Sequence, residues 1–167
     1  MCIRDSVMIG PPADPKDDAR VLKLFFAKEG SHICCGGSTA HMISHYLNKP
    51  IIPVEDSGTD KVPAIATIEG MDLVTEGIIT LQQVADLAEQ YVSDNRLSIT
   101  INSGNDGVSL LCAYLFEQAT DINFFFGKAE NTANDDLDIG MDAKAIVINR
   151  LISSLREMGK NVKISRC

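Results

Sequence analysis

The sequence carries little positive charge. Its 15 lysine and arginine residues are outnumbered by 23 aspartate and glutamate residues, so the formal net charge is −8. Proteins that bind nucleic acids normally present a basic face. The balance therefore argues against a nucleic-acid partner, although it leaves room for a local basic pocket.

Long apolar runs are missing too. No stretch of the sequence approaches the roughly 20 apolar residues that a membrane-spanning helix requires. No secretory signal peptide is visible either. We therefore expect no membrane partner.

The cysteines follow no regular spacing. There are five of them, Cys2, Cys34, Cys35, Cys112 and Cys167. An odd number without the pattern of a disulfide framework indicates reduced thiols and hence a cytoplasmic setting. Adjacent Cys34 and Cys35 are not a Cys-x-x-Cys redox motif, and we expect them to be small buried hydrophobic residues.

Recognisable metal and catalytic patterns are scarce as well. His41 and His45 are four residues apart on an expected helix, so they could share a metal ion. They fall broadly opposite the apolar residues of that helix, which favours a solvated polar face. No Ser-His-Asp or Cys-His arrangement is apparent. We predict no metal site and no catalytic residue, and the sequence identifies no cofactor.

The length fits one domain with a sizeable core, and we place it at residues 7–167. Residues 1–6 (MCIRDS) fit nothing that follows. We interpret them as a translated sequencing adaptor of the kind seen in metagenomic assemblies, in which case the natural chain continues upstream. The alternative is a short disordered leader.

Strands and helices are expected to alternate along the chain. Strands are predicted at 7–9, 33–35, 65–68, 71–74, 97–101, 122–126 and 162–164, helices at 15–29, 38–47, 81–92, 107–118 and 141–158, and loops at 50–63 and 128–140. This alternation predicts an α/β fold, Rossmann-like, with a mostly parallel sheet and helices on both faces. The strands at Ile33 and Ile122 should lie near its centre, because they are continuously apolar.

A glycine-rich turn is the best candidate for a phosphate site. Gly36-Gly37-Ser38-Thr39 joins an expected strand to an expected helix. Glycines let backbone N–H groups face an anion, and a helix N-terminus adds a positive partial charge. The turn is not a P-loop, because no lysine follows the glycines. An ordinary tight turn with a capped helix explains it about equally well.

A second candidate lies in residues 69–77 (EGMDLVTEG), where Asp72, Thr75 and Glu76 are set among apolar residues. Thr80 and Gln83 then have the spacing of a capping box, which predicts a helix starting at Thr80. Open α/β sheets usually bind ligands where a strand ends before a helix. The alternative is a plain strand-to-helix turn.

Two further expected strands end in a glycine. Ile9-Gly10 and Phe126-Gly127 are each followed by an acidic loop, a helix, a glycine and a strand. This internal similarity is weak, and chance explains it equally well. Because parallel strands end at one edge, we predict a single cleft there. It should be lined by Gly10, Gly37, Ser38, Thr39, Thr75, Glu76 and Gly127, and Gly36 and Asp72 are further candidate ligand-binding residues.

Several segments together resemble one protein family. They are residues 9–15 (IGPPADP), 35–40 (CGGSTA), 68–77 (IEGMDLVTEG) and 120–125 (TDINFF). From about Val7 onward the chain resembles the region that follows the catalytic domain in bacterial stage II sporulation protein E-type serine/threonine phosphatases. The resemblance implies an accessory domain with an upstream phosphatase domain as its partner.

The chemistry of that family is not carried over. Its catalytic domain holds metal-binding aspartates beside glycines, and Asp106-Gly107 lacks the surrounding pattern. We therefore predict a non-catalytic accessory or regulatory domain that binds a small phosphorylated or nucleotide-like ligand. The alternatives are a structural or partner-binding domain, and an unrecognised hydrolase that uses Asp72 or Glu76.

Overall fold

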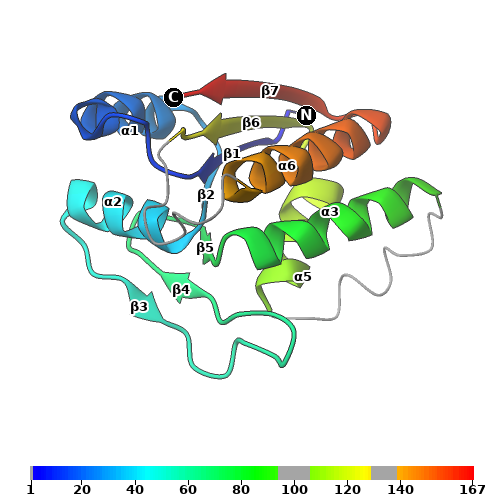
Figure 1. Cartoon of the computed structure of the whole chain (residues 1–167), viewed down its shortest axis with the longest axis horizontal. Helices are drawn as coiled ribbons and strands as arrows, with labels where there is room; N and C mark the ends of the chain where they lie inside the picture. The colour runs from blue at the N-terminus through cyan, green and yellow to red at the C-terminus, as the bar shows by residue number, and fades with distance from the viewer. Residues whose placement is uncertain (1, 94–105, 129–138) are drawn as a thin grey trace.

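A computed structural model describes residues 2–93, 106–128 and 139–167, with the side chains of the last range described from residue 143. One sheet has the strand order β3-β4-β5-β2-β1-β6-β7 (Figure 1). Five of these strands run parallel: β5 (Leu73–Thr75), β2 (Ser31–Cys35), β1 (Arg4–Ile9), β6 (Asp121–Phe126) and β7 (Asn161–Arg166). The predicted α/β class with a mostly parallel sheet is confirmed.

The order of the parallel strands is that of a Rossmann-like fold. Counted along the chain, β5-β2-β1-β6-β7 is the order 3-2-1-4-5. β2 and then β5 lie on one side of β1, and β6 and then β7 lie on its other side. The direction changes between β1 and β6, where sheets of this kind have their topological switch point.

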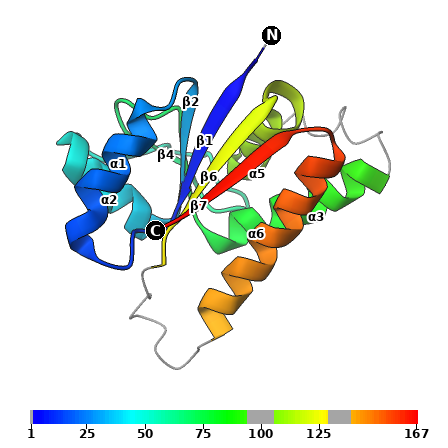
Figure 2. The same ribbon diagram turned by 90° about the horizontal axis from the view of Figure 1, so that it is seen from above.

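Helices cover both faces of the sheet, as predicted (Figure 2). One face carries α1 (Asp18–Ala27), preceded by the 3₁₀ turn η1 (Pro15–Asp17), and α2 (Gly37–Leu47). The other carries α3 (Ile78–Ser93), α5 (Gly107–Cys112) with its π-helical continuation η3 (Ala113–Gln118), and α6 (Ile139–Glu157). The alternation of side chains along each buried strand supplies apolar groups to both layers.

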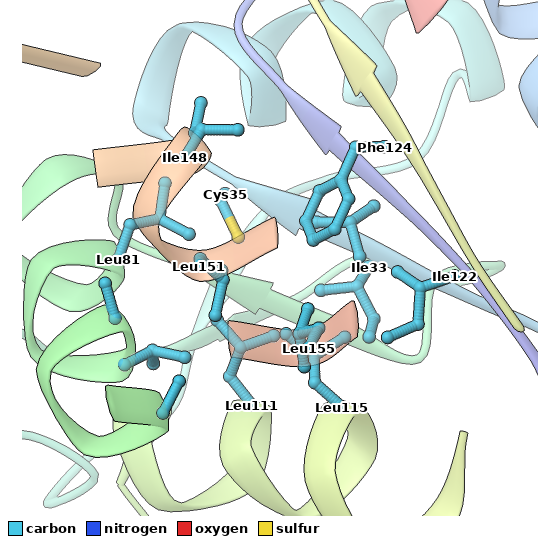
Figure 3. Close-up of a cluster of buried hydrophobic side chains, with 14 of the residues drawn as sticks. Ile33, Cys35, Leu81, Leu111, Leu115, Ile122, Phe124, Ile148, Leu151 and Leu155 are labelled. Atoms are coloured by element: carbon cyan, nitrogen blue, oxygen red, sulfur yellow. The ribbon is translucent and has the colours of Figure 1, made fainter. Parts of the chain in front are cut away.

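The larger core lies between the sheet and α3, α5 and α6 (Figure 3). Ile33 of β2 and Ile122 of β6 both face it and are at most 1% exposed, and neither of their strands is an edge strand. The prediction for these two strands is confirmed. Cys35 joins this core and Cys34 the one under α1 and α2, so the adjacent cysteines serve as small buried side chains on opposite faces. All five cysteines are free thiols.

The first strand begins earlier than predicted. β1 starts at Arg4, and the side chains of Asp5 and Ser6 are buried. The expectation of a disordered leader is therefore wrong for residues 4–6, because ladder pairing with β2 and β6 extends over them. The adaptor origin of residues 1–6 stays a prediction.

The segment between α2 and β5 is more ordered than the predicted loop at 50–63. It contains β3 (Ile52–Pro53), which pairs antiparallel with β4 (Ala66–Thr67), and β4 pairs antiparallel with β5. The strand predicted at 65–68 corresponds to β4. β3 falls within the predicted loop, and its two residues are too few to show a period of two in the sequence. Pro53 cannot donate a ladder hydrogen bond, which fits its place on an edge strand.

Other predicted elements agree to within a few residues at their ends. The helical stretch 107–118 is α5 with η3, the strand 122–126 is β6, and the strand 162–164 is β7. The predicted strand at 97–101 and most of the predicted loop at 128–140 lie outside the described residues. In the parts of the chain that are described, no helix combines the length and the apolar character needed to cross a membrane.

Candidate functional site

The ends of β1, β2, β5 and β6 meet at one edge of the sheet. The ladders place Ile9 beside both Cys35 and Phe126, and Cys35 beside Thr75. The residues that follow these strands are Gly10, Gly36, Glu76 and Gly127. The sheet thus brings together four segments that the sequence predicts for one cleft.

Thr39 ties the start of α2 to the end of β1. Its side chain is 1% exposed, and its Oγ1 accepts a hydrogen bond from the backbone N–H of Gly10 at 2.9 Å. Next to it, the backbone N–H of Gly36 donates to the carbonyl of Thr75 at 3.0 Å. Four predicted site residues are therefore joined in two hydrogen-bonded pairs, but the Thr39 hydroxyl holds the fold together rather than facing solvent.

We expect Thr39→Val to lower the free energy of unfolding by about 1–3 kcal/mol, because the Gly10 N–H would lose its partner at a site with little access to water. Thr39→Ser keeps the hydroxyl and should recover most of that loss. Urea unfolding monitored by circular dichroism measures both variants. Equal stability of the valine and wild-type proteins would show that the hydrogen bond contributes nothing.

The turns after β2 and β5 touch each other. Gly36 has a φ of +116°, a conformation that L side chains rarely adopt, and it stands immediately before α2. A Cβ on Gly77 would come within 3.4 Å of the Gly36 Cα. The two turns thus pack backbone against backbone, and the predicted neighbourhood of Gly37 and Glu76 follows from this contact.

The crevice at the topological switch point is closed by the chain itself. Gly127 is buried and its N–H donates to the carbonyl of Ile9 at 2.8 Å. A Cβ on Gly127 would lie 2.0 Å from the carbonyl oxygen of Pro11 and 2.1 Å from that of Gly10. The Cys167 carbonyl accepts from the N–H groups of Lys128 and Ala13 just beyond. Gly127 therefore lies at the predicted edge but serves close packing and leaves no room for a ligand.

Asp72 does not join the cleft. It precedes β5, whereas Thr75 ends it and Glu76 follows, so Asp72 lies at the opposite edge of the sheet. Its Oδ2 accepts a hydrogen bond from the backbone N–H of His32, near the start of β2, at 2.7 Å. Asp72, a further candidate ligand-binding residue, is therefore separated from Thr75 and Glu76 by the length of β5 and cannot act with them at one site.

Glu76 caps α3. Its Oε2 accepts from the backbone N–H of Thr80 at 3.1 Å, and the helix begins at Ile78 rather than at Thr80. The predicted capping box is wrong: the Gln83 side chain donates instead to the Lys61 carbonyl at 2.7 Å. Thr75 is also engaged internally, since its hydroxyl donates to the Glu76 carbonyl at 2.8 Å.

The start of α2 offers the most accessible backbone donors. No side chain caps this helix. No described residue accepts a hydrogen bond from the backbone N–H groups of Gly37, Ser38 or Thr39, and Gly37 and Ser38 are exposed. Free N–H groups at a helix start, together with the helix dipole, favour an anion.

Carboxylates accept hydrogen bonds from backbone N–H groups at the start of three other helical segments. Asp14 accepts from the N–H of Lys16 at η1, Glu76 from that of Thr80 at α3, and Asp106 from that of Ser109 at α5. In these segments the chain supplies its own anion. At α2 that place is taken by Gly36, which has no side chain to offer.

Thiol and metal chemistry find little support at this edge. Burial raises the pKa of the Cys35 thiol to about 12, and the nearby Glu76 charge acts in the same direction, so the thiol stays protonated. Among the described residues, no group of three or more histidine, cysteine, aspartate or glutamate side chains is arranged to hold a metal ion. His41 and His45 are exposed on the outer side of α2.

Comparison with models of known protein families, with curated proteins and with solved structures gives no match for this chain.

Proposed function

We propose that the chain is a non-catalytic accessory or regulatory domain that binds a small phosphorylated ligand at the turn between β2 and α2. The observation that carries the proposal is the uncapped start of α2, where the N–H groups of Gly37 and Ser38 are exposed and have no acceptor among the described residues. Such an arrangement binds phosphate groups in other α/β proteins. The accessory role rests on the resemblance to the region after the catalytic domain in sporulation-type phosphatases.

The surroundings limit where the ligand lies. Backbone packing of Gly127 against Gly10 and Pro11 closes the crevice between β1 and β6, so a dinucleotide extended across the switch point would not fit. The Glu76 carboxylate repels an anion and accepts hydrogen bonds, so the phosphate belongs at Ser38 and a ligand hydroxyl or amino group belongs toward Glu76.

Gly37→Val tests this site without disturbing the fold. A Cβ on Gly37 would meet no atom within 4 Å, so a valine side chain there has open space and adds bulk next to the N–H groups. We expect phosphate-bearing compounds to bind the wild-type chain and to bind the variant at least tenfold more weakly. A thermal-shift screen of inorganic phosphate, nucleotides and sugar phosphates, followed by titration calorimetry, measures this, because a ligand specific to the native state raises its stability.

Ser38→Ala is the matched control, since it keeps the backbone N–H and removes only the hydroxyl. Its affinity should stay within about threefold of wild type if the N–H groups carry the recognition. Thr39→Pro is less informative, because it also removes the hydrogen bond to Gly10. If no phosphorylated compound stabilises the wild-type chain, the site is wrong and the partner-binding alternative is the better account.

We expect the chain not to hydrolyse a phosphoserine peptide or an aryl phosphate with manganese or magnesium. The two carboxylates considered for a hydrolase, Asp72 and Glu76, flank opposite ends of β5 and cannot act as a pair. Metal-activated water needs several ligands held together. Metal-dependent turnover that copurifies with the chain through successive columns would overturn this expectation.

A further inference from the structure

A surface cavity lies along the C-terminal half of α2, away from the turn proposed to bind phosphate. It measures about 440 Å³ and is lined by His41, Ser44, His45, Asn48, Lys49 and Pro50. Apart from the proline, all of these are polar residues. Two of the three histidines of the chain therefore border the same cavity.

His41, His45 and Asn48 form one stripe along the helix. They occupy positions i, i+4 and i+7, which lie on the same side of an α-helix. All three are exposed, and the buried residues of α2 lie on its other side, at Thr39, Ala40 and Ile43. The β-carbons of residues four apart on a helix are about 5–6 Å from each other, so two imidazole rings at this spacing can reach one ion.

The rings of His41 and His45 are available for binding. Among the described residues, no hydrogen bond or ion pair engages either ring, whereas Nε2 of His32 lies 3.1 Å from the Phe25 carbonyl oxygen. The sequence favours a solvated polar face for the two histidines of α2. A solvated imidazole is also one whose nitrogen can bind a metal without first breaking a contact within the protein.

The charges around the cavity permit a cation. His45 lies in the last turn of α2, where the helix dipole contributes negative partial charge. The nearest lysine in the lining does not oppose this freely, because Nζ of Lys49 lies 3.2 Å from Oε2 of Glu69. A cation bound at the histidines would therefore meet a lysine whose charge is already balanced.

We propose that His41 and His45 bind one divalent transition-metal ion of the Zn²⁺, Ni²⁺ and Cu²⁺ class, with Asn48 as a weaker third donor. Imidazole suits these ions, and two histidines four apart on a helix are the paired ligands of known zinc sites. Mg²⁺ and Ca²⁺ prefer oxygen ligands and should not bind here. With so few protein ligands, water fills the remaining positions and the ion is exchangeable.

Titration calorimetry of the whole chain with NiCl₂, in a buffer free of phosphate and chelators at neutral pH, tests the proposal. Ni²⁺ is the probe because, unlike Cu²⁺, it does not oxidise the exposed thiol of Cys2. We expect saturable binding of one ion per chain, and no binding of Mg²⁺ at the same concentrations.

Variants locate the ion. His41→Asn and His45→Asn should each weaken Ni²⁺ binding at least tenfold, because the helix holds the second imidazole at a high effective concentration. His32→Asn makes the same change at the third histidine and should leave the affinity within about twofold of wild type, as should Cys2→Ser. Thermal unfolding without metal checks that each variant is folded.

Asn48→Gly tests the third donor. Asn48 has a φ of +53°, which glycine also adopts, so the turn is kept while the amide is removed. Ni²⁺ binding should weaken about threefold. Unchanged affinity in this variant would overturn the assignment of Asn48, though not that of the histidines.

Three results would each overturn the proposal: no saturable binding at millimolar Ni²⁺, unchanged affinity in both His41→Asn and His45→Asn, or an equal loss in His32→Asn or Cys2→Ser. His45 lies about two helical turns from Ser38, so phosphate should bind His45→Asn as it binds the wild type. Failure of the metal site therefore leaves the phosphate site untouched, and the reverse also holds.

Discussion

Replacing Asp5 with valine is expected to raise the free energy of unfolding by about 3 kcal/mol or more at pH 8. Asp5 is 1% exposed at the start of β1, and its Oδ2 has no hydrogen-bond partner among the described residues. Burial, and then the charge of Asp72, raise the pKa of its carboxyl group to about 7, although Lys160 opposes the shift. Ionising it in the folded state is therefore costly.

The sign of the pH dependence follows from this shift. Because the pKa is higher in the folded chain than the 3.8 of the free side chain, the folded state holds the proton more tightly. The stability linked to the neutral carboxyl group is complete below about pH 4 and is lost as the pH rises through about 7. The shift corresponds to about 4 kcal/mol, or about 3 kcal/mol after allowance for solvent screening.

Asp5→Asn separates the charge from the rest of the effect, because the amide has the shape of the protonated acid. It should match the wild type at pH 4 and exceed it by about 3 kcal/mol at pH 8. Asp60→Asn, a change at an exposed aspartate, should leave the pH profile of the wild type intact. Urea unfolding at pH 4, 6 and 8 measures the stability of the wild type, Asp5→Val, Asp5→Asn and Asp60→Asn. Parallel pH profiles for the wild type and Asp5→Asn would show that ionisation of Asp5 does not cause the pH dependence.

Ser6, the next residue of β1, is also fully buried. Among the described residues, four buried side-chain polar atoms lack a partner, and two of them belong to Asp5 and Ser6. Native strands rarely leave such groups unpaired. Ser6→Val should therefore also stabilise the chain.

Gly127→Ala is expected to destabilise the fold by about 3 kcal/mol or more. The added Cβ would lie 2.0 Å from the carbonyl oxygen of Pro11 and 2.1 Å from that of Gly10, and both contacts are with backbone. Backbone atoms cannot swing aside as a flexible side chain can, so the end of β6 would have to separate from the loop after β1. Overpacking of this kind belongs to the mechanisms that give large losses of stability.

Gly37→Ala is the matched control, since it makes the same chemical change where a Cβ would meet no atom within 4 Å. It should be neutral or slightly stabilising, because alanine restricts the unfolded chain more than glycine does. Thermal unfolding of the two variants beside the wild type measures the difference. Equal losses in both would mean that the contact between Gly127 and the loop is unimportant.

The sequence by itself determined the class of fold. Continuous apolar stretches at Ile33 and Ile122 marked strands buried on both faces, and the helices between them required crossovers of the α/β kind. It also placed Gly10, Gly36, Thr39 and Thr75 at one edge, because the residues after parallel strands meet there. These features depend on the local pattern of apolar residues and on the handedness of the connections between strands, and both can be inferred from the sequence.

Only the tertiary structure decided what each site residue does. Thr39 and Thr75 turned inward to backbone partners, Glu76 became the cap of α3, and Gly127 closed the switch point instead of lining it. Asp72 lies at the opposite end of β5 from Thr75, because the exact start and length of β5 are set by its pairing with β2. Contacts between residues far apart in the chain fix all of these outcomes, and such contacts leave no period or motif in a single sequence.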